Sequence, residues 1–262
     1  MKNLIVTITL ALSFLTVLLL LMGKKDTVVE TVIEDKDTIC LEDKITLRYE
    51  TKDFVFYEPS IERVQLQVNS ERDSLVYAGL SRALVVAAAY TEKYGWKEFS
   101  HKLIAGDHVV DGKLYEGYDC QENTGAFIYA NRHWSFTNQN IAEAMLDAAL
   151  YKNSCAFQQT MLVHQNRLID IPSKLSVTKT VRRALCDYQN RLVVIDSKNE
   201  LTLGQFASKL QEEGVYSALY LDIGDQSYSL WREYPDSTML AIHPASDSTR
   251  YATNYLVFHW VD

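Results

Sequence analysis

The pattern of apolar and charged positions divides the 262-residue chain into parts of different character. An uncharged, apolar run covers residues 4–22, and a stretch dense in charge follows over residues 23–52. From residue 53 to residue 262, short apolar runs alternate with polar turns, without an internal repeat, a low-complexity tract or a Pro-rich linker. We therefore expect a short tail over 1–3, a juxtamembrane stalk over 23–52 and one folded domain over 53–262.

Several short apolar segments of the expected domain predict β-strands. Residues 64–68 alternate between apolar and polar, which is typical of a strand with one buried face. Residues 84–90 are continuously apolar, as in a central strand buried on both faces. Further strands are predicted at 54–57, 126–129, 161–163, 192–195, 228–231, 239–242 and 254–260, and one more at 45–49 within the stalk.

Two segments repeat their apolar residues at the spacing of a helix. The first covers residues 141–150, with Asn140 placed to act as its N-cap. The second covers residues 203–213, with Thr202 as its N-cap and Gly214 at its C-terminal end. Because strands outnumber helices, we expect an α/β (α+β) fold, with one strand-rich mixed sheet and a few covering helices.

The apolar run near the N-terminus predicts a transmembrane helix. Its 19 residues, from 4 to 22, are just enough to cross a hydrocarbon core of about 30 Å at about 1.5 Å per residue. No small-x-small cleavage site follows, which favours an uncleaved anchor over a cleaved signal peptide. We therefore expect a single-pass membrane protein whose domain is extracytoplasmic, in the periplasm or on the cell surface.

Charge and cysteine content narrow the functional classes. The net charge is −8 and no long run of Lys and Arg is present, which disfavours nucleic acid as a partner. Cys40, Cys120, Cys155 and Cys186 lack the spacing of metal ligands, and the histidines form no HExxH motif. The sequence therefore predicts no metal site and names no cofactor. Two disulfides and four unpaired thiols both remain open for the cysteines.

The C-terminal half carries a family resemblance. An arginine pair precedes the strand at 192–195, the helix and Gly214 follow, and the next strand ends at Asp222. A turn with Gly224 comes next, and Asn254 stands before the last strand. This order resembles the phosphodiester glycosidase family over roughly residues 80–260, most strongly over 182–227. The resemblance implies hydrolysis of a sugar-1-phosphodiester in an envelope or exogenous glycan.

The same resemblance implies roles for individual residues. Asp222 corresponds to the family aspartate and would act in acid/base chemistry or bind the sugar. Arg183 corresponds to the family arginine and would bind phosphate, with Arg182 in its place if the alignment shifts by one. Ser227 would donate a hydrogen bond to phosphate, and Asn254 corresponds to the family asparagine.

Three other polar residues complete the candidate set. Asp225 supplies a second carboxylate near Asp222, as glycoside cleavage generally requires. Asp107 and His108 lie together in a glycine-rich loop and are candidates for an acid/base pair. Ile223-Gly224 stands where the family has two glycines, so a catalytically degenerate domain that binds a glycan or a protein stays open as the alternative.

Overall fold

The computed structural model describes residues 44–68, 81–92, 99–120, 124–171, 177–222, 228–243 and 253–260. All of them belong to the compact unit Cys40–Asp262. The predicted transmembrane run, 4–22, lies outside these ranges. Across the ranges themselves, no helix has the length and apolar character needed to cross a bilayer.

The described chain folds into two β-sheets. The larger, eleven-stranded sheet contains β1 (Thr46–Glu50), β2 (Phe54–Pro59), β5 (His108–Val110), β6 (Lys113–Tyr115), β7 (Thr124–Ala130), β8 (His133–Thr137), β9 (Cys155–His164), β10 (Arg167–Leu168), β11 (Arg183–Tyr188), β12 (Arg191–Ser197) and β13 (Ser217–Leu221). The smaller, five-stranded sheet contains β3 (Arg63–Val68), β4 (Arg82–Ala87), β14 (Ser229–Trp231), β15 (Leu240–His243) and β16 (Asn254–His259).

The order of the strands brings distant parts of the sequence together. The large sheet runs β1-β2-β12-β11-β13-β9-β5-β6, with β7 and β10 also paired to β9 and β8 paired to β7. The small sheet runs β15-β14-β4-β16-β3. Among the strands that the structure describes, every pair is antiparallel, so the expected mixed sheet is wrong. Strand-rich α+β architecture is confirmed, but it comprises two sheets rather than one.

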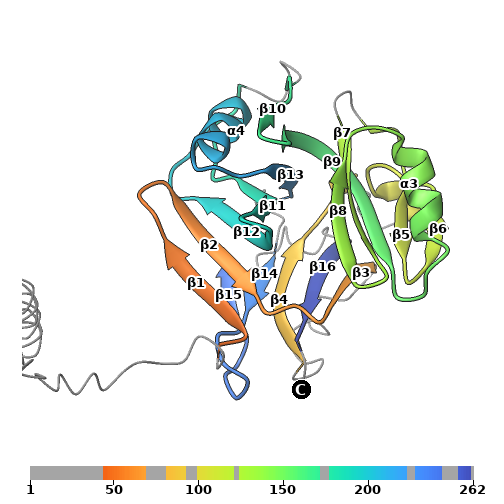
Figure 1. The fold of residues 1–262 in the computed structure, drawn as a ribbon, viewed down its shortest axis with the longest axis horizontal. Coiled ribbons are helices and arrows are strands. Elements are labelled where there is room, and N and C mark those ends of the chain that lie inside the picture. Colours follow the sequence, from red (N-terminus) through yellow and green to blue (C-terminus); the bar gives the residue numbers. More distant parts are fainter. Residues whose placement is uncertain are drawn as a thin grey trace, which may run out of the picture. The chain divides into compact units, whose positions relative to one another are not determined.

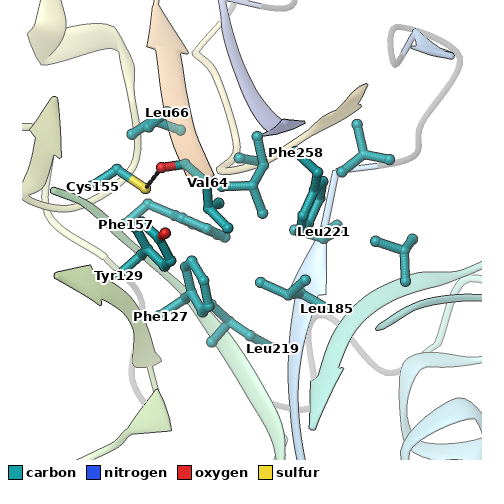
Figure 2. Packing of buried hydrophobic residues seen from close by; sticks show 14 of the residues in the cluster. Val64, Leu66, Phe127, Tyr129, Cys155, Phe157, Leu185, Leu219, Leu221 and Phe258 are labelled. Carbon is teal, nitrogen blue, oxygen red and sulfur yellow. Dashed lines mark hydrogen bonds between the residues drawn. The ribbon is translucent and has the colours of Figure 1, made fainter. Parts of the chain in front are cut away.

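The main core lies between the two sheets. Strand β4 is buried along its whole length, as its unbroken apolar sequence predicted. Figure 2 shows the packing, in which Leu66 and Phe258 of the small sheet share one cluster with Phe127, Phe157 and Leu219 of the large sheet. Alternate residues of each strand point into this layer because successive side chains of a strand face opposite sides of its sheet.

Two α-helices cover the other face of the large sheet (Figure 1). Helix α4 (Leu203–Glu212) begins with the predicted cap: Thr202 Oγ1 accepts from Gln205 N at 3.2 Å, and Gln205 Oε1 accepts from Thr202 N at 3.1 Å. Gly214 ends it with a φ of 91°, which other residues adopt only with strain. Helix α3 (Ile141–Ala148) has the predicted N-cap residue, Asn140, but the Asn140 side chain makes no capping hydrogen bond.

The folded domain starts before residue 53, with the strand that the sequence predicted at 45–49. Strand β1 pairs with β2 and lies before residue 53, within the predicted stalk. Its Thr46 hydroxyl donates to Ala83 O at 2.8 Å and so ties the first strand to the small sheet. Cys120, Cys155 and Cys186 carry free thiols, and Cys40 lies outside the described residues, so the two-disulfide alternative is not realised.

Candidate functional site

Three strand ends meet where the family resemblance predicts a site. Ala88 follows β4, Asp222 follows β13, and Asn254 begins β16. The backbone of Ala88 joins them: its carbonyl accepts from Asp222 N at 3.0 Å, and its N–H donates to Asn254 O at 3.3 Å. The structure therefore brings together two of the predicted site residues, Asp222 and Asn254, from strands of different sheets.

Asn254 serves this junction through its side chain. The residue is 1% exposed. Its Oδ1 accepts from Ala89 N at 2.8 Å, and its Nδ2 donates to Ala89 O at 3.0 Å and Thr91 Oγ1 at 3.2 Å. A buried amide with these partners fixes the course of the backbone after β4. Asn254 is therefore a positioning residue beside the site.

Asp222 lies among three tyrosines. Burial is the main cause that raises the pKa of Tyr90, Tyr220 and Tyr118, the last to about 12, and the negative charge of Asp222 contributes to the increase in each case. The Tyr90 and Tyr220 rings lie 5.6 Å apart between their centroids. These phenols therefore stay protonated at neutral pH and can act as hydrogen-bond donors near a carboxylate. The sequence analysis missed them, although Tyr90 closes the apolar run at 84–90.

Arg182 shares the sheet face of Tyr220. The guanidinium donates to Tyr220 Oη at 3.2 Å and to Leu201 O at 3.1 Å, and it also donates to Thr178 O. It lies over the Tyr220 ring at 5.7 Å. Arg182 thus fixes Tyr220, which in turn packs against Tyr90 next to Asp222. The described hydrogen bonds of the Arg182 guanidinium are all made to other residues of the domain, and Arg182 is 6% exposed.

Arg183 points to the opposite face, into the layer between the sheets. Its Nε and one terminal nitrogen donate to the two carboxylate oxygens of Asp196 at 2.6 and 2.7 Å, and the other terminal nitrogen donates to Ser229 Oγ at 2.7 Å. The side chain is fully buried. This bidentate pair joins β11 and β12 of the large sheet to β14 of the small sheet. The structure therefore does not bring the Arg183 guanidinium to Asp222.

One histidine, His243, lies beside the Arg183–Asp196 pair. His243 Nε2 lies 4.0 Å from Asp196 Oδ2. Burial and the nearby Arg183 charge lower the pKa of His243, against the opposing effect of Asp196. Asp196 was not among the predicted site residues. Its register opposite Arg183 across β11 and β12 is set by strand pairing, which the sequence does not display.

Asp107 and His108 do not pair with each other. The His108 ring contacts Gly106 O at 3.1 Å and His101 Nδ1 at 2.8 Å, while the Asp107 carboxylate accepts from Gly117 N at 3.4 Å. Burial lowers the pKa of His108 to about 4. The segment is nevertheless close to the site, because Ala105 N donates to Tyr90 O at 2.9 Å.

Two predicted site residues lie outside the described residues. Asp225 and Ser227 belong to residues 223–227, which lie outside the described ranges, so their roles stay predictions. Among the residues that are described, no group of three or more His, Cys, Asp or Glu is placed to hold a metal ion.

Comparison with known proteins bears on the fold. No family model matches the chain, and no curated protein matches it in sequence. Among solved structures, the catalytic domain of zebrafish N-acetylglucosamine-1-phosphodiester alpha-N-acetylglucosaminidase, auto-inhibited by its pro-peptide, superposes with a TM-score of 0.53 at 13% identity over 82% of each chain. The fold of this chain is distantly similar to that of a phosphodiester glycosidase catalytic domain.

A second solved structure is also similar. A hypothetical protein from Synechocystis matches 82% of this chain and 61% of its own, at 11% identity and a TM-score of 0.44. At 13% identity, the likeness to the zebrafish domain extends to the arrangement of strands and helices and no further. The chemistry must therefore be argued from the residues around Asp222.

Proposed function

We propose that this domain hydrolyses a sugar-1-phosphodiester, with Asp222 at the centre of its site. The observation that carries the proposal is the position of Asp222, at the end of a buried strand and among three tyrosines, in a fold shared with a phosphodiester glycosidase domain. Perturbed ionisable groups at a strand end are typical of functional sites. The substrate class follows the family resemblance around residues 182–227.

A single carboxylate can support this reaction. Water attacks the anomeric carbon, Asp222 takes the proton of that water, and the bond from the carbon to the phosphate oxygen breaks. The electron pair leaves with a phosphate monoester, whose second pKa is about 6. Because such a leaving group needs little protonation, the general acid that an ordinary glycosidase supplies is not essential here. Asp225 remains the candidate for a second carboxylate.

The tyrosines would hold the substrate. Tyr90 and Tyr118 are half-buried, and their raised pKa values keep the hydroxyl groups protonated. Phenol hydroxyls donate to sugar or phosphate oxygens, while the rings pack against the faces of a sugar. Arg182 would act indirectly, by holding Tyr220 in place.

The test is an assay of the purified protein on a panel of sugar-1-phosphodiesters, with the released reducing sugar as the readout. We expect Asp222→Asn to lower the rate by about a hundredfold or more, the usual contribution of a general base. Asp236→Asn, which removes a carboxylate from an exposed position, is the matched control and should leave the rate unchanged. Equal rates for Asp222→Asn and the parent would refute the role of Asp222.

A second candidate is a domain that binds such glycans without hydrolysis. The hydrogen bonds of the two arginines favour this candidate. Arg183 is bound to Asp196 and Ser229, and Arg182 is bound to backbone carbonyls and Tyr220. Neither guanidinium is thus presented to a phosphate near Asp222. Calorimetry would identify this case as binding of the phosphodiester that Asp222→Asn weakens, with no product formed by the parent.

We further propose that residues 4–22 anchor the domain to a membrane on its extracytoplasmic side. The support is the uncharged 19-residue run between Lys2 and Lys24. Deletion of residues 1–23 should move the protein from the membrane fraction to the soluble fraction. Protease should cleave the full-length protein in cells whose outer membrane, where present, has been removed and whose inner membrane is intact. Protection of the domain in such cells would contradict this orientation.

A further inference from the structure

A second site is suggested by a polar groove at the far end of β16. The groove has a volume of about 580 Å³ and lies where the start of β3, the β7–β8 turn, the turn before β9 and the end of β16 meet. Its walls include Arg63, Arg132, Lys152, Tyr129, His259 and Trp260. His259 is five residues along β16 from Asn254, or about 16 Å at about 3.3 Å per residue. The groove is therefore separate from the Asp222 site.

The groove is basic on a protein that is acidic overall. Arg63, Arg132 and Lys152 are exposed on its walls, whereas the chain as a whole carries a net charge of −8. Among the lining residues that the structure describes, the one carboxylate is that of Glu62, which lies 3.9 Å from Arg132 in an exposed ion pair that contributes little to stability. Asp111 lines the adjoining hollow beside Arg63. The lining thus presents an excess of positive charge, which attracts anions.

The pKa of His259 responds to the positive charges around the groove. Burial and the charges of Arg63 and Arg82 lower the pKa of His259 to about 4. Its Nε2 lies 3.3 Å from Gln65 Oε1, so the ring is held at the groove wall. A bound dianion would offset the two arginine charges and raise the pKa of His259. The ring therefore provides a direct readout of occupancy.

The walls are built from fixed elements. Asn131 and Arg132 form the two-residue β7–β8 turn with φ values of 50° and 63°, the left-handed conformation of a tight hairpin. Tyr129 Oη donates to Glu62 O at 3.0 Å, and Trp260 N donates to Ser81 O at 3.1 Å. A groove held open by such contacts loses little entropy when it binds a ligand.

We propose that this groove binds a phosphorylated or sulfated sugar. The cationic side chains would hold the charged ester, which is largely a dianion for a phosphate and a monoanion for a sulfate. Trp260 offers an aromatic surface for a sugar ring, and Glu62, Asn131 and Asn153 offer acceptors and donors for its hydroxyls. The volume suits a ligand of that size. This inference does not depend on hydrolysis at Asp222, since it concerns binding at a different end of the fold.

The experiment is calorimetric titration of the full-length protein in detergent with glucose 6-phosphate, glucose 6-sulfate, glucose and inorganic phosphate. We expect both esters to bind and glucose to bind at least tenfold more weakly. Arg63→Gln and Arg132→Gln should each weaken ester binding about tenfold, the usual loss for a hydrogen bond to a charged group. Arg132 is 77% exposed, so its replacement leaves the fold intact.

Two controls separate this site from general charge and from the Asp222 site. Lys102→Gln removes an equally exposed cation, at 75%, from another part of the surface and should not change the affinity. Asp222→Asn should also leave it unchanged. The imidazole signals of His259 should titrate at higher pH when glucose 6-phosphate is bound. Affinity unaffected by Arg63→Gln and Arg132→Gln, equal binding of glucose, or equal binding of inorganic phosphate would overturn the proposal.

Discussion

Loss of one partner of the buried Arg183–Asp196 pair should strongly destabilise the domain. Asp196→Ala leaves the guanidinium of Arg183 in the layer between the sheets, where the side chain is fully buried. Only the bond to Ser229 Oγ would remain of its three described contacts. A charge buried without its counter-ion cannot be hydrated, so the folded state alone carries the cost.

The expected magnitude follows from the geometry. Removal of one member of a well-formed buried ion pair costs about 3–5 kcal/mol. For a domain of this size, each kcal/mol lowers the melting temperature by about 2–4 °C, which gives a total of about 6–20 °C. Arg183→Met/Asp196→Leu removes both charges and fills the space with apolar groups. We expect the double variant to lose much less stability than the sum of the losses of the two single variants.

The measurement is urea unfolding of the parent, Asp196→Ala, Arg183→Met and Arg183→Met/Asp196→Leu, followed by far-UV circular dichroism. Single variants within 1 kcal/mol of the parent, or a double variant as unstable as the sum, would refute the reasoning. The same proteins test the role predicted for Arg183 from the sequence. A stable Arg183→Met protein that cannot hydrolyse a sugar-1-phosphodiester would support the phosphate-binding role that the sequence predicted for Arg183.

Two further predictions concern the α4 cap and the His108 ring. Thr202→Ala removes the capping box and should lower the free energy of unfolding by about 1 kcal/mol, seen as a lower urea midpoint, whereas Thr238→Ala at an exposed position should not. Because the folded-state pKa of His108 is about 4 against the usual 6.5, the unfolded chain binds the proton first, and stability should fall by on the order of 3 kcal/mol from about pH 6.5 to about pH 4. An unchanged pH slope in His108→Gln would contradict this.

Local signals in the sequence identified much of the secondary structure. Thr202 and Gly214 mark the two ends of α4, because a capping hydroxyl and a positive φ depend on neighbouring backbone alone. The continuous apolar run at 84–90 identified the buried central strand β4. By contrast, Asn140 occupies the predicted N-cap position of α3 in a left-handed conformation, and its side chain makes no capping hydrogen bond.

The site was only partly predictable. Asp222 and Asn254, both selected from the family pattern, lie beside the same residue, Ala88. Tyr220 lies on the strand that leads to Asp222, whereas Tyr90 and Tyr118 come from segments far away in the chain, and no short motif contains all three. Arg182 and Arg183 are neighbours in sequence, yet one faces α4 and the other faces the small sheet. Side-chain alternation decides this, and it is known only once the strand register is known.

The sequence by itself determined the strand-rich character of this protein, the caps of α4 and the placement of Asp222 at a strand end, because these depend on local propensity and on the period of apolar residues. Only the tertiary structure decided that Arg183 joins two sheets through Asp196, and that Arg63, Arg132 and Lys152 surround one groove. These groups are separated by many residues, so their meeting depends on the pairing of distant strands. That pairing reflects the burial of whole sheet faces, a property that no short segment carries alone.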